Sequence, residues 1–305
     1  MGHDHGAAHG TAAAAHRGRL AVVLALTGTV FVVEVVGALL SGSLALLADA
    51  AHMATDAVGI GMALGAVTLA QRPAGGRRTF GWQRIEVLAA VANGLLLLGV
   101  GVYVVVEAVH RISAPPDIHS GWMLGVAALG LAVNSGSLAL LHAGQGESLN
   151  TRGAYLEVAG DALGSVAVIA AAVVIAATGW TGADVLASFA VGALVLPRAW
   201  TLLREAFDVL LEAAPRGVDL DQVRAHVLGV PGVLDVHDLH AWTITSGLPV
   251  LSAHVVVTEE VLADGHGGRV LDALGSCLGD HFDLEHCTFQ LESADHRGHE
   301  SPVHD

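Results

Sequence analysis

Four ionisable side chains lie within apolar sequence at a spacing that suits metal binding. His52 and Asp56 are four residues apart in ADAAHMATDAVG, and Glu157 and Asp161 are four residues apart in LEVAGDALGS. Residues four apart share one face of a helix, so each segment presents two possible metal ligands side by side. One imidazole nitrogen and three carboxylate oxygens can surround a divalent cation such as Zn²⁺ in a tetrahedron.

Both segments belong to long apolar stretches. The chain of 305 residues is 53% hydrophobic and 14% charged, with a mean hydropathy of +0.60, which is typical of membrane proteins. A charged residue at mid-bilayer costs about 2.5 to 3.5 kcal/mol, so buried charged groups need partners. We therefore expect the segments carrying the two pairs to meet. Six apolar runs are long enough to cross a hydrocarbon core of about 30 Å, namely 20–40, 44–69, 85–109, 121–141, 154–177 and 182–203.

The second and fifth of these spans contain no Arg or Lys. A divalent cation or protons are therefore the expected counter-charge for the acidic groups. The alternative is that these polar groups hydrogen-bond to one another and only specify helix packing. Asp49, one turn before His52, is expected either to guide a leaving cation or to bond the SGS turn that precedes it. Glu34 in the first span is either a structural group or part of a water path.

Beyond residue 213 the apolar runs stop, and Pro215 and Gly217 mark a joint. DLDQVRAHVLG and GGRVLDALGSCLGDHF predict helices, while VLDVHDLHAWTIT, VLSAHVVVT and EHCTFQLES predict strands. The order αββαβ suits an open sheet with helices on one face. The fold class is thus a six-helix transmembrane bundle over 19–213 followed by a small α/β domain over 214–293, of the ferredoxin or metallochaperone type.

The expected sheet offers a second group of metal ligands. If the turn SGLP pairs Thr245 with Val250, His254 lies opposite Ala241 and shares a face with His237. His240 then points to the other face. On the last strand His286 and Glu292 alternate onto one face, so a metal site of His237, His254, His286 and Glu292 is predicted, with His240 and Cys287 in reserve. The alternative is that these are surface His residues of a His-rich chain.

The distribution of Arg predicts how the chain crosses the membrane. Of the segments that flank the six spans, those on one side of the membrane contain only Arg111. Those on the other side contain Arg17, Arg19, Arg72, Arg77, Arg78, Arg84, Arg152, Arg204 and Arg216. Short cytoplasmic loops are enriched in Arg, so both termini are expected in the cytoplasm and the protein in the inner (plasma) membrane. Two Cys in the cytoplasmic part are expected to be reduced thiols. The net charge of −15 gives no support to nucleic-acid binding.

Three stretches together resemble the cation diffusion facilitator family of metal/proton antiporters: SGSLALLADAAHMATDAVG, RRTFGWQRIEVLAAVANGLLLLGVGVYVVVEAVHRI and LNTRGAYLEVAGDALGSVAVIAAA. The likeness covers about residues 17–292. It implies a transport site of His52, Asp56, Glu157 and Asp161, a homodimer in the lipid bilayer, and exit of the metal as protons enter. It also implies an Arg84–Glu212 charge pair at the dimer interface, joining the membrane half to the tail, and a regulatory role for the cytoplasmic metal site.

The chain departs from the family pattern at Glu157. Zinc-preferring members carry HxxxD in both metal-binding spans, whereas the fifth span here has a carboxylate in place of the imidazole. Oxygen is a harder ligand than nitrogen, so we expect Zn²⁺ to remain the first cargo while Cd²⁺, Co²⁺, Fe²⁺ and Mn²⁺ are admitted more readily. The loop PAGGRRTFGWQ has neither Asp nor His, so no further metal site is expected there.

Two other functions are compatible with buried metal ligands. A membrane metal sensor would need a signalling output domain, and the sequence of the tail does not indicate one. A metal-dependent intramembrane hydrolase would need three ligands, an open water position and a separate acid or base. Here all four ligands lie in two pairs, which does not suit a hydrolase. Metal export is therefore favoured. The cation is then the transported cargo, and neither a cofactor nor a catalytic residue is expected. The His-rich ends, 1–18 and 294–305, are expected either to collect metal loosely or to reflect composition alone.

Overall fold

The computed structural model describes residues 25–142, 149–245, 247–263, 265–282, 284 and 286–299. The predicted N-terminal His-rich tail and the last residues of the C-terminal one lie outside these described residues. The described chain forms two compact units. One contains residues 25–61 and Ala92–Thr201, and the other contains Met62–Val91 and the residues from Leu202 onward.

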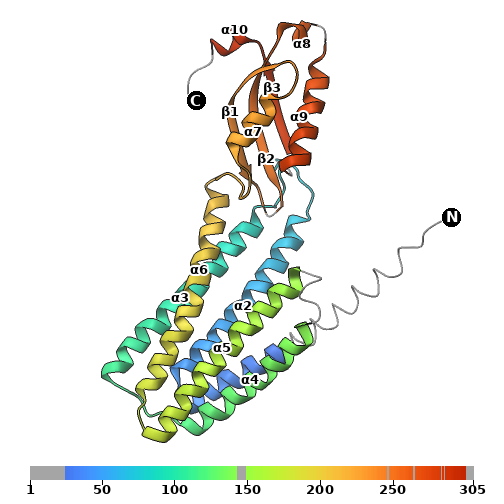
Figure 1. Ribbon diagram of the computed structural model, residues 1–305. Helices are drawn as coiled ribbons and strands as arrows, with labels where there is room; N and C mark the ends of the chain where they lie inside the picture. Colours follow the sequence, from blue (N-terminus) through green and yellow to red (C-terminus); the bar gives the residue numbers. More distant parts are fainter. Residues whose placement is uncertain are drawn as a thin grey trace, which may run out of the picture. The chain divides into compact units, whose positions relative to one another are not determined.

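Long apolar helices make up most of the described chain before residue 211 (Figure 1). Five of the described helices have the length and composition to cross a membrane, which confirms the second to sixth predicted spans. The first predicted span is described from residue 25 and is helical over Ala25–Ser41. The five are α2 (Leu44–Ala70), α3 (Ile85–Ser113), α4 (Ser120–His142), α5 (Leu149–Thr178) and α6 (Gly182–Leu210).

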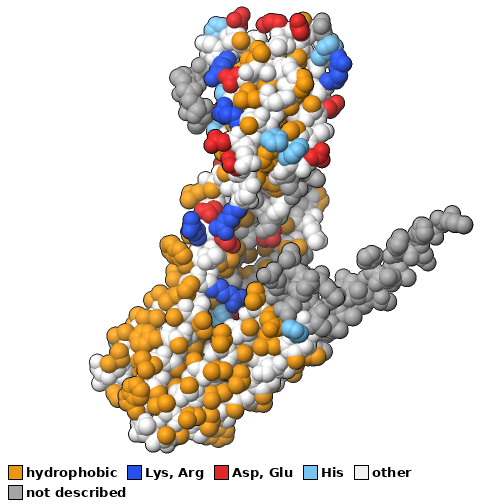
Figure 2. Space-filling model, viewed as in Figure 1, with side chains coloured by type: hydrophobic (Ala, Val, Ile, Leu, Met, Phe, Trp, Pro, Cys, Tyr) orange, Lys and Arg blue, Asp and Glu red, His pale blue; other side chains and the backbone are white. Residues whose placement is uncertain are grey.

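In the first unit, small residues lie where helices pack together, and large hydrophobic residues lie on the outward faces. Gly37 lies so close to α4 that an added Cβ would be 2.5 Å from a Val126 methyl, and Gly101 meets Leu196 of α6 at the same distance. Small residues let membrane helices approach closely. Figure 2 shows hydrophobic side chains covering much of the visible face of the long helices. The exposed large hydrophobic residues of this unit include Ile60, Tyr103, Leu129, Leu163 and Leu186.

The tail has the predicted order αββαβ, with two short helices added. The elements are α7 (Leu220–Leu228), β1 (Val233–Thr243), β2 (Pro249–Val257), α8 (Glu259–Ala263), α9 (Gly267–Phe282), β3 (His286–Glu292) and α10 (Ala294–Arg297). The strands lie in the order β1-β2-β3. β1 and β2 are antiparallel, and β2 and β3 are parallel because α9 crosses over between them. Asp219 caps α7 by accepting from the Asp221 and Gln222 amides.

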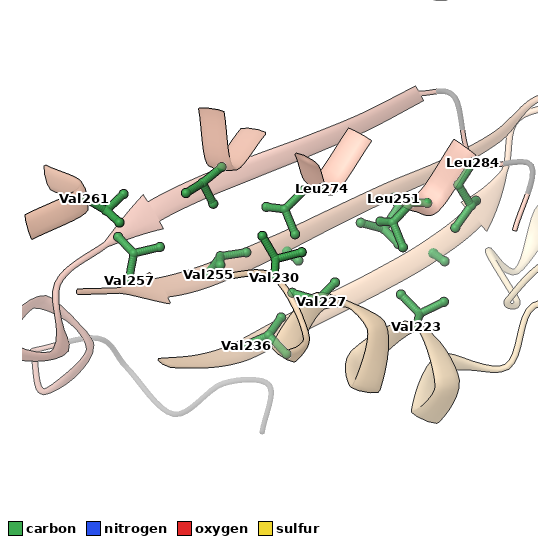
Figure 3. Packing of buried hydrophobic residues seen from close by; sticks show 14 residues of the cluster. Val223, Val227, Val230, Val236, Leu251, Val255, Val257, Val261, Leu274 and Leu284 are labelled. Atoms are coloured by element: carbon green, nitrogen blue, oxygen red, sulfur yellow. The ribbon is translucent and has the colours of Figure 1, made fainter. Parts of the chain in front are cut away.

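The core of this domain lies between the sheet and the helices α7 and α9 (Figure 3). Leu251 and Val255 of β2 pack against Val223 of α7 and Leu274 of α9. Successive strand residues point to opposite faces, so His254 lies on the face turned away from these helices. The helix-covered face is therefore apolar, and polar ligands occupy the other face.

The predicted register of the hairpin is wrong. Ala241 pairs with Leu251, and His254 lies opposite His237 rather than Ala241. The turn is longer than the predicted SGLP, since the last pair is Thr243 with Pro249. A bulge between His237 and His240 also inserts one extra residue into β1, with Asp238 at a φ of 49°. Such a bulge shifts all pairing beyond it.

Candidate metal centres

The first unit brings together the four ionisable residues predicted for the transport site; we call them the α2–α5 seam. His52 Nε2 lies 3.5 Å from Asp56 Oδ2 and 4.0 Å from Asp161 Oδ1. Glu157 and His52 line one cavity of about 380 Å³ formed by α2, α5 and α6. The i,i+4 spacing on each helix explains this convergence, because it puts both members of each pair on the face toward the other helix.

Two atoms of the seam are buried without a hydrogen-bond partner among the described residues: His52 Nδ1 and Asp161 Oδ1. The residues are 8% and 4% exposed. An unsatisfied buried polar atom costs about 1 to 3 kcal/mol. A cation or a proton bound at this place would therefore gain more than at a solvated surface.

Arg198 of α6 was missed by the sequence analysis. Its Nη1 lies 3.7 Å from Asp56 Oδ2, and its Nη2 lies 3.9 Å from Glu157 Oε2. The expectation that only a metal or protons balance the seam is thus corrected, because a third helix supplies a fixed positive charge. The signal was available, since Arg198 lies inside the predicted span 182–203, where basic residues are rare.

Asp49 lines the seam cavity rather than bonding the SGS turn. It is 3% exposed, and an added Cβ on Gly164 of α5 would lie 2.9 Å from its Oδ1. The SGS turn is held by Asp184 of α6 instead. Asp184 accepts from Ser43 Oγ at 2.5 Å and from the Leu44 amide at 2.9 Å.

Glu34 belongs to a second buried polar group next to the seam. It is 1% exposed. An added Cβ on Gly130 of α4 would meet Glu34 Oε1 at 2.9 Å and Ser165 Oγ at 3.3 Å. Glycine at position 130 thus lets the Glu34 carboxylate lie against α4 and α5. This arrangement suits either of the two roles expected for Glu34.

In the tail, three predicted ligands meet on the open face of the sheet; we call them the sheet-side cluster. His237 Nε2 lies 2.6 Å from Glu292 Oε1, and His254 Nδ1 lies 3.6 Å from Glu292 Oε2. One ligand atom from each of the three residues lies within 4.8 Å of the others. Glu292 is 4% exposed, so its carboxylate interacts with His237 and His254 rather than with water.

His286 does not join the sheet-side cluster, which corrects the prediction. It shares a face with Glu292 but pairs with Val250, whereas Glu292 pairs with Val256 at the other end of β3. Six residues of strand separate the two side chains by about 20 Å. The His286 ring instead makes an edge contact with Phe80, with 5.9 Å between ring centroids.

The two reserve ligands lie in other surroundings. His240 Nε2 is 3.0 Å from Asp238 Oδ1. Cys287 packs against the helix-covered core, and its Sγ donates to the Leu284 carbonyl at 3.1 Å. Burial raises the pKa of the Cys287 thiol to about 11, so it stays protonated near neutral pH and is a poor metal ligand.

The charge pair implied by the resemblance is present within the second unit. Arg84 Nη2 donates to Glu212 Oε1 at 2.8 Å. The side chains are 42% and 58% exposed. Next to it, Thr245 Oγ1 donates to Glu86 Oε2 at 2.6 Å. The start of α3 is thereby bonded to the β1–β2 turn and to the residues after α6.

Residues 20–211 match the family model of the cation efflux transmembrane domain, and residues 215–294 match that of the cation efflux protein cytoplasmic domain. The chain belongs to the cation efflux family. The resemblance read from the sequence motifs is therefore confirmed, as is the fold class. Because this is a family of transporters, membership favours transport over the sensor and hydrolase alternatives.

Relatives in the cation efflux family are similar over most of their length. The metal cation efflux system protein CzcD of Cupriavidus metallidurans is 48% identical, covering 90% of this chain and 86% of that protein. The zinc transporter ZitB of Escherichia coli is 42% identical, with 90% and 87% covered. A cadmium, cobalt and zinc/H(+)-K(+) antiporter of Bacillus subtilis is 37% identical, with 97% and 93% covered.

Proposed function

We propose that this protein exports divalent metal cations from the cytoplasm in exchange for protons, with Zn²⁺ as the first cargo. The observation that carries the proposal is the α2–α5 seam, where an imidazole and carboxylates converge inside apolar helices. The names of the relatives support it, since they include a zinc transporter and a cadmium, cobalt and zinc antiporter. The carboxylate of Glu157 favours the harder ions Fe²⁺ and Mn²⁺ as further cargo, and the name of the cadmium, cobalt and zinc antiporter supports adding Cd²⁺ and Co²⁺.

The metal-binding atoms of the seam also explain how metal transport is coupled to proton transport. Imidazole and carboxylate groups bind a metal only when deprotonated, so metal and protons compete for one site. The imidazole of His52 and the buried carboxylates beside it are the groups that can carry the protons. Asp49 lies one turn before His52 on α2, lines the same cavity and receives the leaving cation. A cycle of metal binding, helix rocking and proton entry then moves the two in opposite directions.

Arg198 has a part in this cycle. Its guanidinium is a permanent charge that does not deprotonate, and it lies near one carboxylate from each ligand helix. It offsets part of the negative charge of the seam when no cation is bound. An arriving divalent cation replaces this contact, so Arg198 weakens binding and helps release.

The remaining assignments complete the proposal. Residues 19–213 form the transport domain of a homodimer in the inner membrane, with both termini in the cytoplasm. Residues 214–293 form the metal-binding and dimerisation domain, and the ends at 1–18 and 294–305 are His-rich tails. The sheet-side cluster of His237, His254 and Glu292 senses cytoplasmic metal, and its ligand spacing supports that role.

The decisive experiment is metal uptake into proteoliposomes under a pH gradient, with Zn²⁺, Cd²⁺, Co²⁺, Mn²⁺ and Fe²⁺ each offered alone. The wild type is expected to move at least Zn²⁺ with counterflow of protons, and Asp161→Ala is expected to move none of the five. Asp208→Ala is the matched control, because it removes an exposed carboxylate of α6 outside the seam. Full transport by Asp161→Ala would remove the seam from the mechanism.

A further inference from the structure

A second group of metal-ligating side chains lies on the other layer of the tail domain. His226 of α7 and Cys277 and His281 of α9 converge; we call them the helix-side cluster. His226 Nδ1 is 3.5 Å from Cys277 Sγ, and the two imidazole rings are 4.7 Å apart at their centroids. One ligand atom from each residue lies within 4.8 Å of the others.

The buried faces of the two helices place these side chains. Val227 and Leu278 are fully buried in the core between helices and sheet. His226 and Cys277 each precede one of these core residues, so they lie at the edge of the buried face, where α7 and α9 meet. Cys277 and His281 are one helical turn apart and therefore share a face. The cluster is separated from the sheet-side cluster by the core and the sheet.

Neighbouring groups orient both imidazoles. Phe282 makes an edge contact with the His226 ring at 5.0 Å. His281 Nδ1 lies 2.8 Å from the Cys277 carbonyl, and a carbonyl can only accept, so Nδ1 carries the proton. The lone pair of His281 is thereby left on Nε2. A hydrogen bond of this kind from the other ring nitrogen is typical of metal-ligating histidines.

The spacing matches a tetrahedral metal ion. With Zn–S near 2.3 Å and Zn–N near 2.05 Å, the sulfur and nitrogen ligands of a tetrahedron are about 3.5 Å apart. The observed separation of Cys277 Sγ and His226 Nδ1 is 3.5 Å. Two imidazoles and a thiolate favour Zn²⁺, Co²⁺ and Cd²⁺ over Mg²⁺ or Ca²⁺.

We propose that His226, Cys277 and His281 form a metal site for Zn²⁺ or a similar borderline cation, which joins α7 to α9. The site is independent of the transport seam and of the sheet-side cluster. With three protein ligands, its fourth position is open to water. Metal binding there fixes the two helices against each other and so stabilises the tail domain when cytoplasmic metal is high.

Cobalt absorbance tests this site in the full-length protein, purified without a His tag. The chain contains 18 His but only two Cys, so a sulfur-to-cobalt charge-transfer band in the near ultraviolet reports a thiolate ligand alone. The wild type is expected to show this band on addition of Co²⁺ and to lose it on addition of Zn²⁺. Cys277→Ser is expected to lack the band, and Cys287→Ala is expected to keep it.

Two further variants test the imidazoles, and one separates this site from transport. His226→Ala and His281→Ala are each expected to lower the Co²⁺ affinity read from the band by about tenfold or more. Asp161→Ala is expected to keep the band unchanged while losing uptake, so each proposal can fail without the other. Absence of the band in wild type, its persistence in Cys277→Ser, or an unchanged affinity in both His variants would overturn the proposed site.

Discussion

Arg198 is the residue that most changes the chemistry of the seam. Its two nitrogens lie 3.7 and 3.9 Å from Asp56 and Glu157. The side chain is 46% exposed, so solvent screens the attraction to about 1 kcal/mol or less. In the proposed transport cycle, that energy favours the metal-free seam and must be overcome when a cation binds.

Replacing Arg198 is therefore expected to strengthen cation binding. In Arg198→Gln the half-saturating Zn²⁺ concentration for uptake should fall about fivefold, the equivalent of about 1 kcal/mol. The maximal rate should fall too, because release loses its competing charge. Arg198→Lys is the control, since it retains a positive charge. Unchanged uptake parameters in Arg198→Gln would show that the guanidinium does not act on the seam.

At the scale of the elements, the contact between α2 and α5 depends on Gly164. An added Cβ would lie 2.9 Å from Asp49 Oδ1, and this carboxylate is buried and cannot move away freely. Gly164→Ala is thus expected to push α2 from α5 and to slow Zn²⁺ uptake at least severalfold while the protein still folds. The control is Gly136→Ala, where the added Cβ meets nothing within 4 Å. Equal uptake by the two variants would contradict this account.

Elements were predictable from the sequence where one periodic pattern determined them. The long apolar runs gave the membrane helices, and alternation with turn residues gave the order αββαβ. The pairing of His52 with Asp56, and of Glu157 with Asp161, followed from helix geometry alone.

Relations between elements were harder to predict, since they depend on packing. The bulge near Asp238 changed the register, so His254 came to face His237 directly. His286 shares a face with Glu292 but lies at the other end of the strand. Arg198 acts on the seam from a third helix, and the helix-side cluster joins residues 51 positions apart. No local spacing rule indicates such contacts.

At the scale of the whole molecule, the Arg84–Glu212 pair links two distant parts of the chain at an exposed position. Exposed ion pairs contribute about 0 to 1 kcal/mol. Glu212→Ala is therefore expected to shift the thermal midpoint of the purified protein by only a few degrees. The matched control is Glu205→Ala, which removes another exposed ion pair, that with Arg216. Failure of Glu212→Ala to yield folded protein would assign the pair a much larger structural role.

The bond between Asp184 and the first residues of α2 has a consequence for movement. Asp184 bonds the first turn of α6 to the beginning of α2. Arg198 lies about 20 Å further along α6, where it approaches Asp56 near the middle of α2. The Asp184 attachment is buried and consists of three hydrogen bonds, whereas the Arg198 contact is half-exposed and weak, so only the first holds the two helices firmly together. If α2 tilts in the proposed transport cycle, the Asp184 end of α6 is therefore expected to move with it, while the Arg198 end can separate from Asp56.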